Sequence, residues 1–352
     1  MSKPELFDIA ELRQVAKWYY ADHVPKKEIA KRLHNIEIRG VTRRLKQARE
    51  RGIVRIEIPE TVECGEEHEL RQQFPHLRKI ITVPNAEYPE LFNLWGVEAA
   101  RYFEELTARG QHHVGISGGE TLLTFCETLG THRRDNVHIH TTALIGRGEL
   151  ASTASHVDPL VNATILWSKC GRVTGHCHYA TVPPYDGVTR EKITAELDGL
   201  AKRQPIREVI KRMDDITIAF AGLGLVKSKV LTSQLTMTGL LEPIISPEQL
   251  AEEGAFADLA YCLFDLNGAT QDRWRFFLTA GACDDDPNRR GIGFFKQMVK
   301  DGKTVIVIAG TRKERAVYAA LKAELFNVWI TDRETLADVH NKAFKDSELL
   351  PS

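Results

Sequence analysis

The sequence predicts an α/β protein of two domains, in which a small helical domain precedes a larger domain built on a parallel sheet. The chain has 352 residues, more than the roughly 250–300 at which one hydrophobic core stops growing. Residues 1–60 hold fourteen Lys and Arg against nine Asp and Glu, whereas the remainder holds thirty-three against thirty-nine. From about residue 79 onward, short apolar runs alternate with helical stretches. We therefore expect domains at 1–60 and 79–352, joined by a linker at 61–78.

Three helices are expected in the basic domain, because its apolar residues recur at helical spacing. The first helix is indicated by Leu6, Ile9, Leu12, Ala16 and Tyr19. A short second helix is expected after Pro25, with an inner face of Ile29, Ala30 and Leu33. The third is expected to bury Ile38, Val41, Leu45 and Ala48.

The outer side of the third helix carries a stripe of long polar side chains. Arg39, Thr42, Arg43 and Lys46 are spaced i, i+3, i+4 and i+7, so they lie on one face. Such a helix suits the major groove of DNA, where long donors reach base edges and nearby cations contact phosphates. The alternating run IVRIEI, residues 53–58, predicts a strand beside it. We therefore predict a winged helix-turn-helix domain, against the alternative of a solvated surface helix. The DNA-binding residues expected are Lys26, Lys27, Arg39, Thr42, Arg43, Lys46 and Arg49.

The larger domain is expected to be a Rossmann-like parallel sheet with helices on both faces. Its buried strands are predicted at KIITVP, HVGIS, VHIHTTALIG, ITIAFAG, TVIVIAG and FNVWIT. Amphipathic helices such as WGVEAARYFEELTARG and KERAVYAALKAEL lie between them.

Ligands in such sheets bind at the carboxyl ends of the strands, so the residues after each strand are candidates. HVGIS is followed by Gly118, Gly119, Glu120 and Thr121, then by a predicted helix. Two glycines there let backbone N–H groups approach an anion at the helix N-terminus. LGLVKSK follows ITIAFAG, and Thr311, Arg312 and Lys313 follow TVIVIAG. We expect these three loops to converge on one pocket, although plain turn geometry also explains any single loop.

The run KEIAKRLHNIEIRGVTRRLKQARERGIVRIEI resembles the N-terminal domain of the SorC family of bacterial sugar-responsive transcription regulators. Three further segments are similar to successive blocks of that family's effector domain: GVEAARYFEELTARGQHHVGISGGETL, GAFADLAYCLFDLNG and AGTRKERAVYAALKAELFNVWITD. The resemblance implies a domain related to sugar-phosphate isomerases and deaminases that binds phosphorylated sugars or related metabolites.

The resemblance also implies roles for individual residues. Gly118, Gly119, Glu120 and Thr121 would form an anion-holding turn, and Lys313 would add a cation. Asp258 would accept hydrogen bonds from sugar hydroxyls, and Tyr185 would cover the pocket. If Glu120 points inward, charge repulsion favours an uncharged effector; if it points outward, a phosphate remains possible. The effector-binding residues expected are Gly118, Gly119, Glu120, Thr121, Tyr185, Gly222, Gly224, Asp258, Gly310, Thr311, Arg312 and Lys313.

Other motifs are given structural interpretations. CGRVTGHCHY gathers Cys170, His176, Cys177 and His178, but alternation along a strand would turn Cys177 away from the histidines, so no metal is expected. The acidic residues 284–286 lack the spaced ligands of a calcium loop. HExxH and P-loop motifs are absent from the sequence. No cofactor is expected.

The N-terminus lacks the apolar core of a secretory signal, and the apolar stretch at 216–226 is too short for the roughly 20 residues that span a bilayer. Scattered cysteines fit reduced thiols, so we expect a cytoplasmic protein with no membrane partner. The favoured hypothesis is a non-enzymatic transcription regulator, a dimer or tetramer, whose affinity for double-stranded operator DNA is controlled by a sugar, sugar phosphate or polyol. The alternatives are an isomerase- or deaminase-like enzyme with an appended basic domain, and a nucleic-acid scaffold without ligand.

Overall fold

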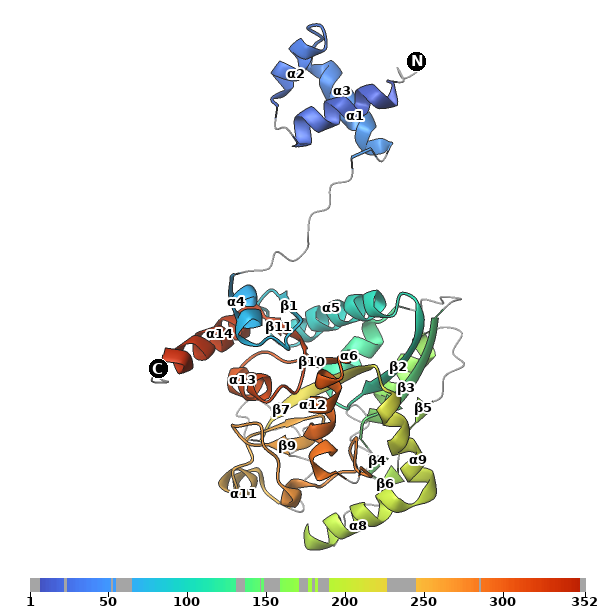
Figure 1. Cartoon of the computed structure of the whole chain (residues 1–352), viewed down its shortest axis with the longest axis vertical. Coiled ribbons are helices and arrows are strands. Elements are labelled where there is room, and N and C mark those ends of the chain that lie inside the picture. The colour runs from blue at the N-terminus through green and yellow to red at the C-terminus, as the bar shows by residue number, and fades with distance from the viewer. Residues whose placement is uncertain are drawn as a thin grey trace. The chain divides into compact units, whose positions relative to one another are not determined.

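The structure is a computed structural model in which the chain divides into two compact units, Met1–Val62 and Glu63–Ser352 (Figure 1). The structure describes residues 7–21, 24–51, 53–54, 65–130, 137–145, 147–148, 159–170, 177–178, 181–182, 190–226, 245–284 and 286–348. In these parts of the chain, no helix is both long enough and apolar enough to cross a membrane.

The first unit contains the three predicted helices. They are α1 (Ile9–Ala16), continued by the π-helical turn η1 (Lys17–Ala21), then α2 (Lys26–Arg32) and α3 (Ile38–Glu50). Val41, Leu45 and Ala48 are buried as predicted, but the prediction for Ile38 is wrong, because its side chain is 49% exposed. Ile36, in the turn before α3, packs against the core in its place.

The predicted wing strand over 53–58 lies outside the described residues, apart from Ile53 and Val54. These two pack against the small core that contains Ala48. Arg44 also ties α3 to α1, since its Nε donates to Glu11 Oε1 over 2.7 Å. Arg44 is therefore a structural residue of the unit rather than part of the outer stripe.

The expectation of a linker over 61–78 needs correcting for residues 65–78. Helix α4 (Gly65–Gln73) lies there and packs against the C-terminal helix α14 (Arg333–Glu348). Leu70, Phe74 and Leu77 are buried in the core of the second unit. Residues 65–78 therefore belong to the α/β domain.

The second unit is built on a parallel sheet with the strand order β1-β11-β10-β7-β2-β3-β5, which confirms the predicted fold class. Its strands are β1 (Lys79–Val83), β2 (Gly110–Ile116), β3 (Val137–Ala143), β5 (Cys177–His178), β7 (Ile218–Leu225), β10 (Thr304–Ile308) and β11 (Val328–Asp332). A separate parallel pair is formed by β4 (Arg147–Gly148) and β6 (Thr181–Val182).

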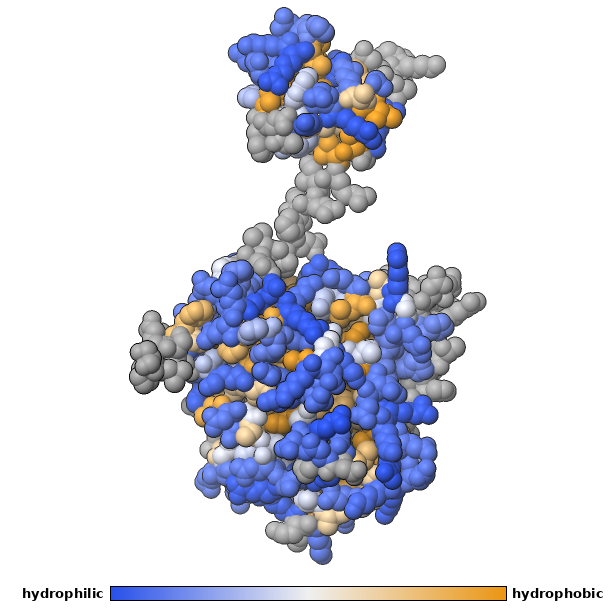
Figure 2. Space-filling model, viewed as in Figure 1, coloured by the Kyte–Doolittle hydropathy of each residue, from blue (hydrophilic) through white to orange (hydrophobic). Residues whose placement is uncertain are grey.

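Helices cover both faces of the sheet, so the strands are buried on both sides. Ile81 and Ile330 contribute to one core, whereas their neighbours Ile80 and Trp329 contribute to the other. The first core includes residues of α5 (Glu90–Leu106), α6 (Glu120–Thr128) and α7 (Pro159–Lys169). The second includes residues of α4, α8 (Arg190–Lys202), α9 (Gln204–Arg212), α11 (Pro247–Glu252), α12 (Ile292–Lys300), α13 (Glu314–Lys322) and α14. Short 3-10 turns lie at Met213–Asp215, Asp272–Trp274 and Pro287–Arg289. Consistent with this layering, the face of the unit drawn in Figure 2 is largely hydrophilic.

A short hairpin pairs with the C-terminal part of β7 in the antiparallel direction. It consists of β8 (Ala257–Leu259) and β9 (Cys262–Phe264), and its turn residues Ala260 and Tyr261 both have positive φ, at 47° and 65°. Two-residue hairpin turns of this kind usually contain Asn or Gly, so the conformation carries a cost here. The Ala260 N–H donates to Gly222 O over 3.0 Å, which holds the turn against the carboxyl end of β7.

The order of the strands also fixes where a ligand crevice is expected. From β2 the chain moves outward to β3, whereas from β7 it moves the other way, to β10 and β11. The direction of winding therefore reverses between β2 and β7. In open α/β sheets, ligands bind outside the carboxyl ends of the strands at such a reversal.

Candidate functional site

The predicted DNA-binding stripe lies on the surface of α3. Arg39, Thr42, Arg43 and Lys46 are all exposed, at positions that place them on one side of the helix. Lys27, at the start of α2, is exposed as well, whereas Lys26 is half-buried with its Nζ 5.3 Å from the centre of the Tyr19 ring. The side chain of Arg49 lies outside the described residues.

The β2–α6 turn is the first element of the predicted effector site. Ser117 and Gly118 are buried, and Gly119 has a φ of 115°, which favours glycine. The fully buried Asn162 of α7 donates from Nδ2 to Ser117 O over 3.1 Å and to Gly119 O over 3.4 Å. These bonds turn the carbonyl groups toward α7 and fix the orientation of the turn.

The carboxyl end of β7 touches this turn. The Gly222 N–H donates to Ser117 Oγ over 3.1 Å, and a Cβ built at Gly222 would lie 3.7 Å from Gly118 O. A Cβ at Gly224 would lie only 2.1 Å from Asp258 Oδ1, so glycine is needed there for Asp258 to lie across β7.

Asp258 and Lys313 meet at the same place. Lys313 Nζ donates to Leu223 O over 2.6 Å, and the Tyr261 N–H donates to Asp258 Oδ2 over 3.0 Å. Burial raises the pKa of Asp258 to about 6, while the Tyr261 N–H and the positive charge of Lys313 act in the opposite direction. Burial lowers the pKa of Lys313, and the charge of Asp258 opposes that shift. The structure thus places a buried carboxylate and an ammonium group beside the predicted anion-holding turn.

The loop after β10 is held by a residue that sequence reasoning missed. Asp332, buried at the end of β11, accepts a hydrogen bond from the Thr311 N–H over 3.0 Å. A Cβ at Gly310 would lie 1.9 Å from Asp332 Oδ2, and both Thr311 and Arg312 have positive φ. Left-handed backbone is costly for a β-branched residue, and the hydrogen bond from Asp332 supports it at Thr311.

Tyr88, in the loop after β1, was also missed. Burial raises the pKa of its hydroxyl, and the negative charges of Glu120 and Asp332 raise it further. The side chain of Glu120 is exposed at the first turn of α6. The charges of both carboxylates therefore act on the Tyr88 hydroxyl.

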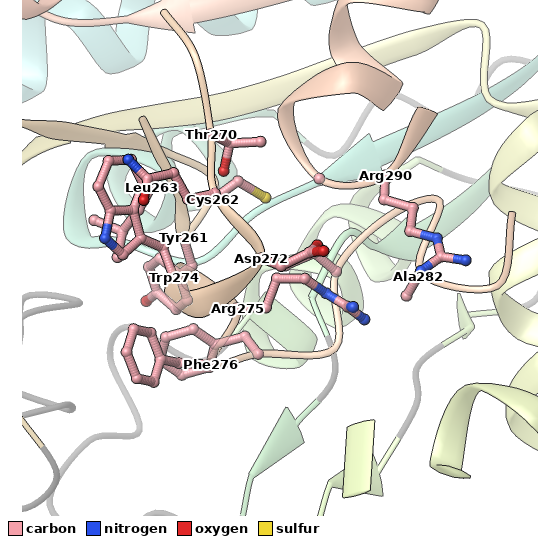
Figure 3. A pocket seen from close by; sticks show the side chains of 14 residues that line it. Tyr261, Cys262, Leu263, Thr270, Asp272, Trp274, Arg275, Phe276, Ala282 and Arg290 are labelled. Atoms are coloured by element: carbon pink, nitrogen blue, oxygen red, sulfur yellow. The ribbon is translucent and has the colours of Figure 1, made fainter. Parts of the chain in front are cut away.

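A pocket of about 490 Å³, including its open mouth, adjoins the Ala260–Tyr261 turn. In Figure 3 the rings of Tyr261, Trp274 and Phe276 gather on one side, and the side chain of Arg290 lies opposite them. Arg275, which also lines the pocket, pairs with Asp198 of α8 over 2.8 Å. The lining residues are Tyr261, Cys262, Leu263, Thr270, Gln271, Asp272, Trp274, Arg275, Phe276, Phe277, Thr279, Ala282, Arg290 and Gly291. Asp258 and Lys313 are not among them, so this pocket lies beside the predicted site and shares only the hairpin turn with it.

Several predicted features lie outside the described residues. They include Tyr185, Asp285 and most of the CGRVTGHCHY segment. Among the residues that the structure does describe, no group of three or more His, Cys, Asp or Glu side chains could hold a metal ion. Asp284 instead pairs with Arg289 over 3.4 Å, and Asp286 Oδ1 accepts the Asn288 N–H over 2.9 Å.

The pKa of Asp258 leads to a testable pH dependence. An ionised carboxylate accepts hydrogen bonds from hydroxyl groups, whereas a protonated one has lost part of that capacity. With a pKa of about 6, Asp258 is ionised above that pH. If Asp258 accepts hydrogen bonds from sugar hydroxyls, as the resemblance implies, ligand affinity should fall as the pH drops below 6, by at most about tenfold per pH unit. Calorimetric titrations between pH 5 and 8 measure this, and Asp258→Asn should remove the dependence. An affinity that rises on acidification would contradict the assigned role.

Comparisons with protein families, curated proteins and solved structures found similar proteins. A family model described as "Putative sugar-binding domain" matches residues 61–339. The transcriptional regulator LsrR of Enterobacter sp. (strain 638) is 22% identical over 331 residues, which cover 92% of this chain and 90% of that protein. The deoxyribonucleoside regulator of Bacillus subtilis (strain 168) is 22% identical over 330 residues, covering 92% and 94%. The crystal structure of the full-length sorbitol operon regulator SorC from Klebsiella pneumoniae superimposes with a TM-score of 0.60 at 20% identity, covering 96% of this chain and all of that one.

Proposed function

Because this chain belongs to the SorC family of transcriptional regulators, which carry this sugar-binding domain, we propose that it binds operator DNA through α3. A carbohydrate bound in the second unit then determines whether the DNA is held or released. The observation that carries the proposal is the match of residues 61–339 to the sugar-binding family, on a chain whose first unit presents an exposed basic stripe. A domain that binds a metabolite is thereby joined to one suited to the major groove.

The effector is proposed to lie at the carboxyl ends of β2, β7 and β10. There, Asp258 would accept hydrogen bonds from hydroxyl groups, and Lys313 would supply a positive charge. The turn at Gly118 and Gly119 would offer backbone N–H groups to the ligand. Two hydrogen bonds that join the ends of these strands support this placement: the Gly222 N–H donates to Ser117 Oγ, and Lys313 Nζ donates to Leu223 O. A sugar, a sugar phosphate and a polyol all fit this set of donors and acceptors. Thermal-shift measurements with matched pairs, such as a polyol and its phosphate, distinguish them through the increase in Tm that only a bound ligand produces.

Regulation is proposed to act through a homo-oligomer, dimeric or tetrameric. Helix-turn-helix proteins usually bind as dimers to half-sites about one helical turn apart, so the spacing of two first units sets DNA affinity. An effector that favours one spacing changes that affinity by a coupling free energy, typically about 1–3 kcal/mol.

Arg43 and Lys27 should affect DNA binding in different ways. Arg43→Ala should weaken binding to the operator by about 1–3 kcal/mol and leave random DNA less affected, because arginine on this helix can bond to a base edge. Lys27→Ala should weaken binding to both DNAs alike and lower the slope of log affinity against log salt by about one, as expected for a phosphate contact. Binding curves on both DNAs across a salt series separate these effects. Equal losses on both DNAs for Arg43→Ala would exclude Arg43 from base recognition.

An enzyme of the sugar-phosphate isomerase class is the second candidate, and one observation favours it. Asp258, with a pKa of about 6, lies beside Lys313, and an acid and a base in proximity are what proton transfer requires. We propose that this pair binds ligand without turnover. Incubating the protein with sugar phosphates and analysing the products by NMR tests this, and conversion that Lys313→Ala abolishes would establish the enzyme instead.

A further inference from the structure

Ile38 is an apolar side chain placed where the first turn of α3 meets solvent. It is 49% exposed, although the neighbouring Ile36 packs into the core of the unit. Single exposed apolar residues are common on proteins, so exposure alone assigns no role. The position, however, is at the N-terminal end of the helix that carries Arg39 and Arg43.

Thr42 lies one helical turn after Ile38 and is also exposed. Its Oγ1 donates to Ile38 O over 3.2 Å, so the hydroxyl proton is directed to the helix backbone rather than to a base. The hydroxyl oxygen can still accept a hydrogen bond, and the methyl is the apolar group that Thr42 offers a partner. The first two turns of α3 therefore present two aliphatic groups on one face, next to the cationic part of the stripe.

Base edges in the major groove offer one apolar group, the C5-methyl of thymine, and aliphatic side chains contact it. Residues at the N-terminal end of a recognition helix are those that reach base edges. We propose that Ile38, together with the methyl of Thr42, contacts a thymine methyl, so that each operator half-site holds a thymine opposite the first turn of α3. This assignment rests on the proposed DNA-binding function and adds an apolar specificity determinant to the cationic stripe.

The test uses the full chain and a DNA duplex that it selects from a random-sequence library. Each thymine of the duplex is replaced singly by deoxyuridine, which lacks only the C5-methyl. With the unmodified protein, one position in each half-site should lose about fourfold in affinity, the effect of one buried methyl group. With Ile38→Ala, the same replacement should have no further effect or a much smaller one.

Two variants serve as controls. Ile9→Ala removes a side chain that is 48% exposed on α1, outside the stripe, and should keep the full sensitivity to deoxyuridine. Thr42→Ser keeps the hydroxyl and removes the methyl, so it should reduce the sensitivity without removing it. Since Ile38 is not part of the buried core, Ile38→Ala should keep the Tm of the unmodified protein.

The outcomes separate this assignment from the proposed function. If the protein prefers the selected DNA but no deoxyuridine position changes its affinity, the assignment is overturned and the regulator stands. The assignment also fails if the sensitive position remains equally sensitive in Ile38→Ala, or if that variant changes only the oligomeric state, which would place Ile38 in a protein interface. Absence of any preference over random DNA would overturn the DNA-binding function and the assignment with it.

Discussion

Replacing Lys313 with Ala should abolish the response of operator binding to the effector while effector-free binding stays unchanged. Lys313 Nζ is held at the carboxyl end of β7 by its bond to Leu223 O, beside Asp258. Without the ammonium group, the pKa of Asp258 rises further, because burial is no longer opposed by a positive charge. The variant thus loses a cation and, near pH 6, part of its carboxylate acceptor.

The response is measured as the ratio of operator affinities with and without effector, which a coupling of about 1–3 kcal/mol would set at roughly 5–150-fold. Lys322→Ala is the matched control, because Lys322 is exposed at the C-terminal end of α13, the helix that begins directly after Lys313. A response retained in Lys313→Ala would move the effector away from this edge. The pocket lined by Arg275 and Arg290 would then be the next place to test.

Asp332→Ala should produce the largest loss of stability at the candidate site. The Asp332 carboxylate accepts the Thr335 N–H and hydroxyl at the start of α14, each over 2.9 Å, and the Thr311 N–H over 3.0 Å. Each buried donor left without its acceptor costs about 1–3 kcal/mol. We expect the free energy of unfolding to fall by about 3 kcal/mol or more, a large part of the 5–15 kcal/mol typical of a domain.

Chemical denaturation of the full chain, followed by tryptophan fluorescence, measures this loss. Asp338→Ala, at an exposed position of the same helix, should change the free energy of unfolding by less than about 0.5 kcal/mol. Asp332→Asn keeps one acceptor oxygen and should fall between the two. A loss for Asp332→Ala no greater than that of the control would show that the donors find other partners, and that this carboxylate does not hold the Thr311 loop.

The sheet could be predicted from the sequence because parallel strands buried on both faces read as continuous apolar runs. Each of the six runs predicted as strands overlaps a strand of the structure, and the family match confirms the resemblance to SorC regulators. The hairpin of β8 and β9 was not predicted. Its strands have three residues each and a turn with neither Asn nor Gly, so the usual hairpin signals are missing.

In α3, helical periodicity placed Val41 and Leu45 correctly but not Ile38. Ile38 lies at the margin of the buried stripe, where the path of the preceding turn decides which side chain enters the core. That path brings Ile36 inward, and Gly40 leaves room for it, since a Cβ there would lie 3.1 Å from Ile36 Cδ1. Periodicity within one helix carries no information about this choice.

The candidate site could be predicted only in part, for a similar reason. Glycines and charged residues that directly follow a strand are visible in the sequence, and Asp332 could have been found by the same rule, because it follows the run FNVWIT. Asn162 could not, since it lies within a helix and reaches the β2–α6 turn only through tertiary packing. Tyr88 lacks a sequence signal too, because its position depends on how the loop after β1 folds over the edge of the sheet.

The proposed regulator is tested first by binding of the purified full chain to the DNA upstream of its own operon, titrated against salt with random DNA as the control. We expect affinity for the upstream DNA to exceed affinity for random DNA by about a thousandfold or more at physiological salt, and a carbohydrate effector to change the former. Equal, weak binding to both DNAs, with or without carbohydrate, would show that the protein is not such a regulator and that the basic stripe on α3 is only a charged surface.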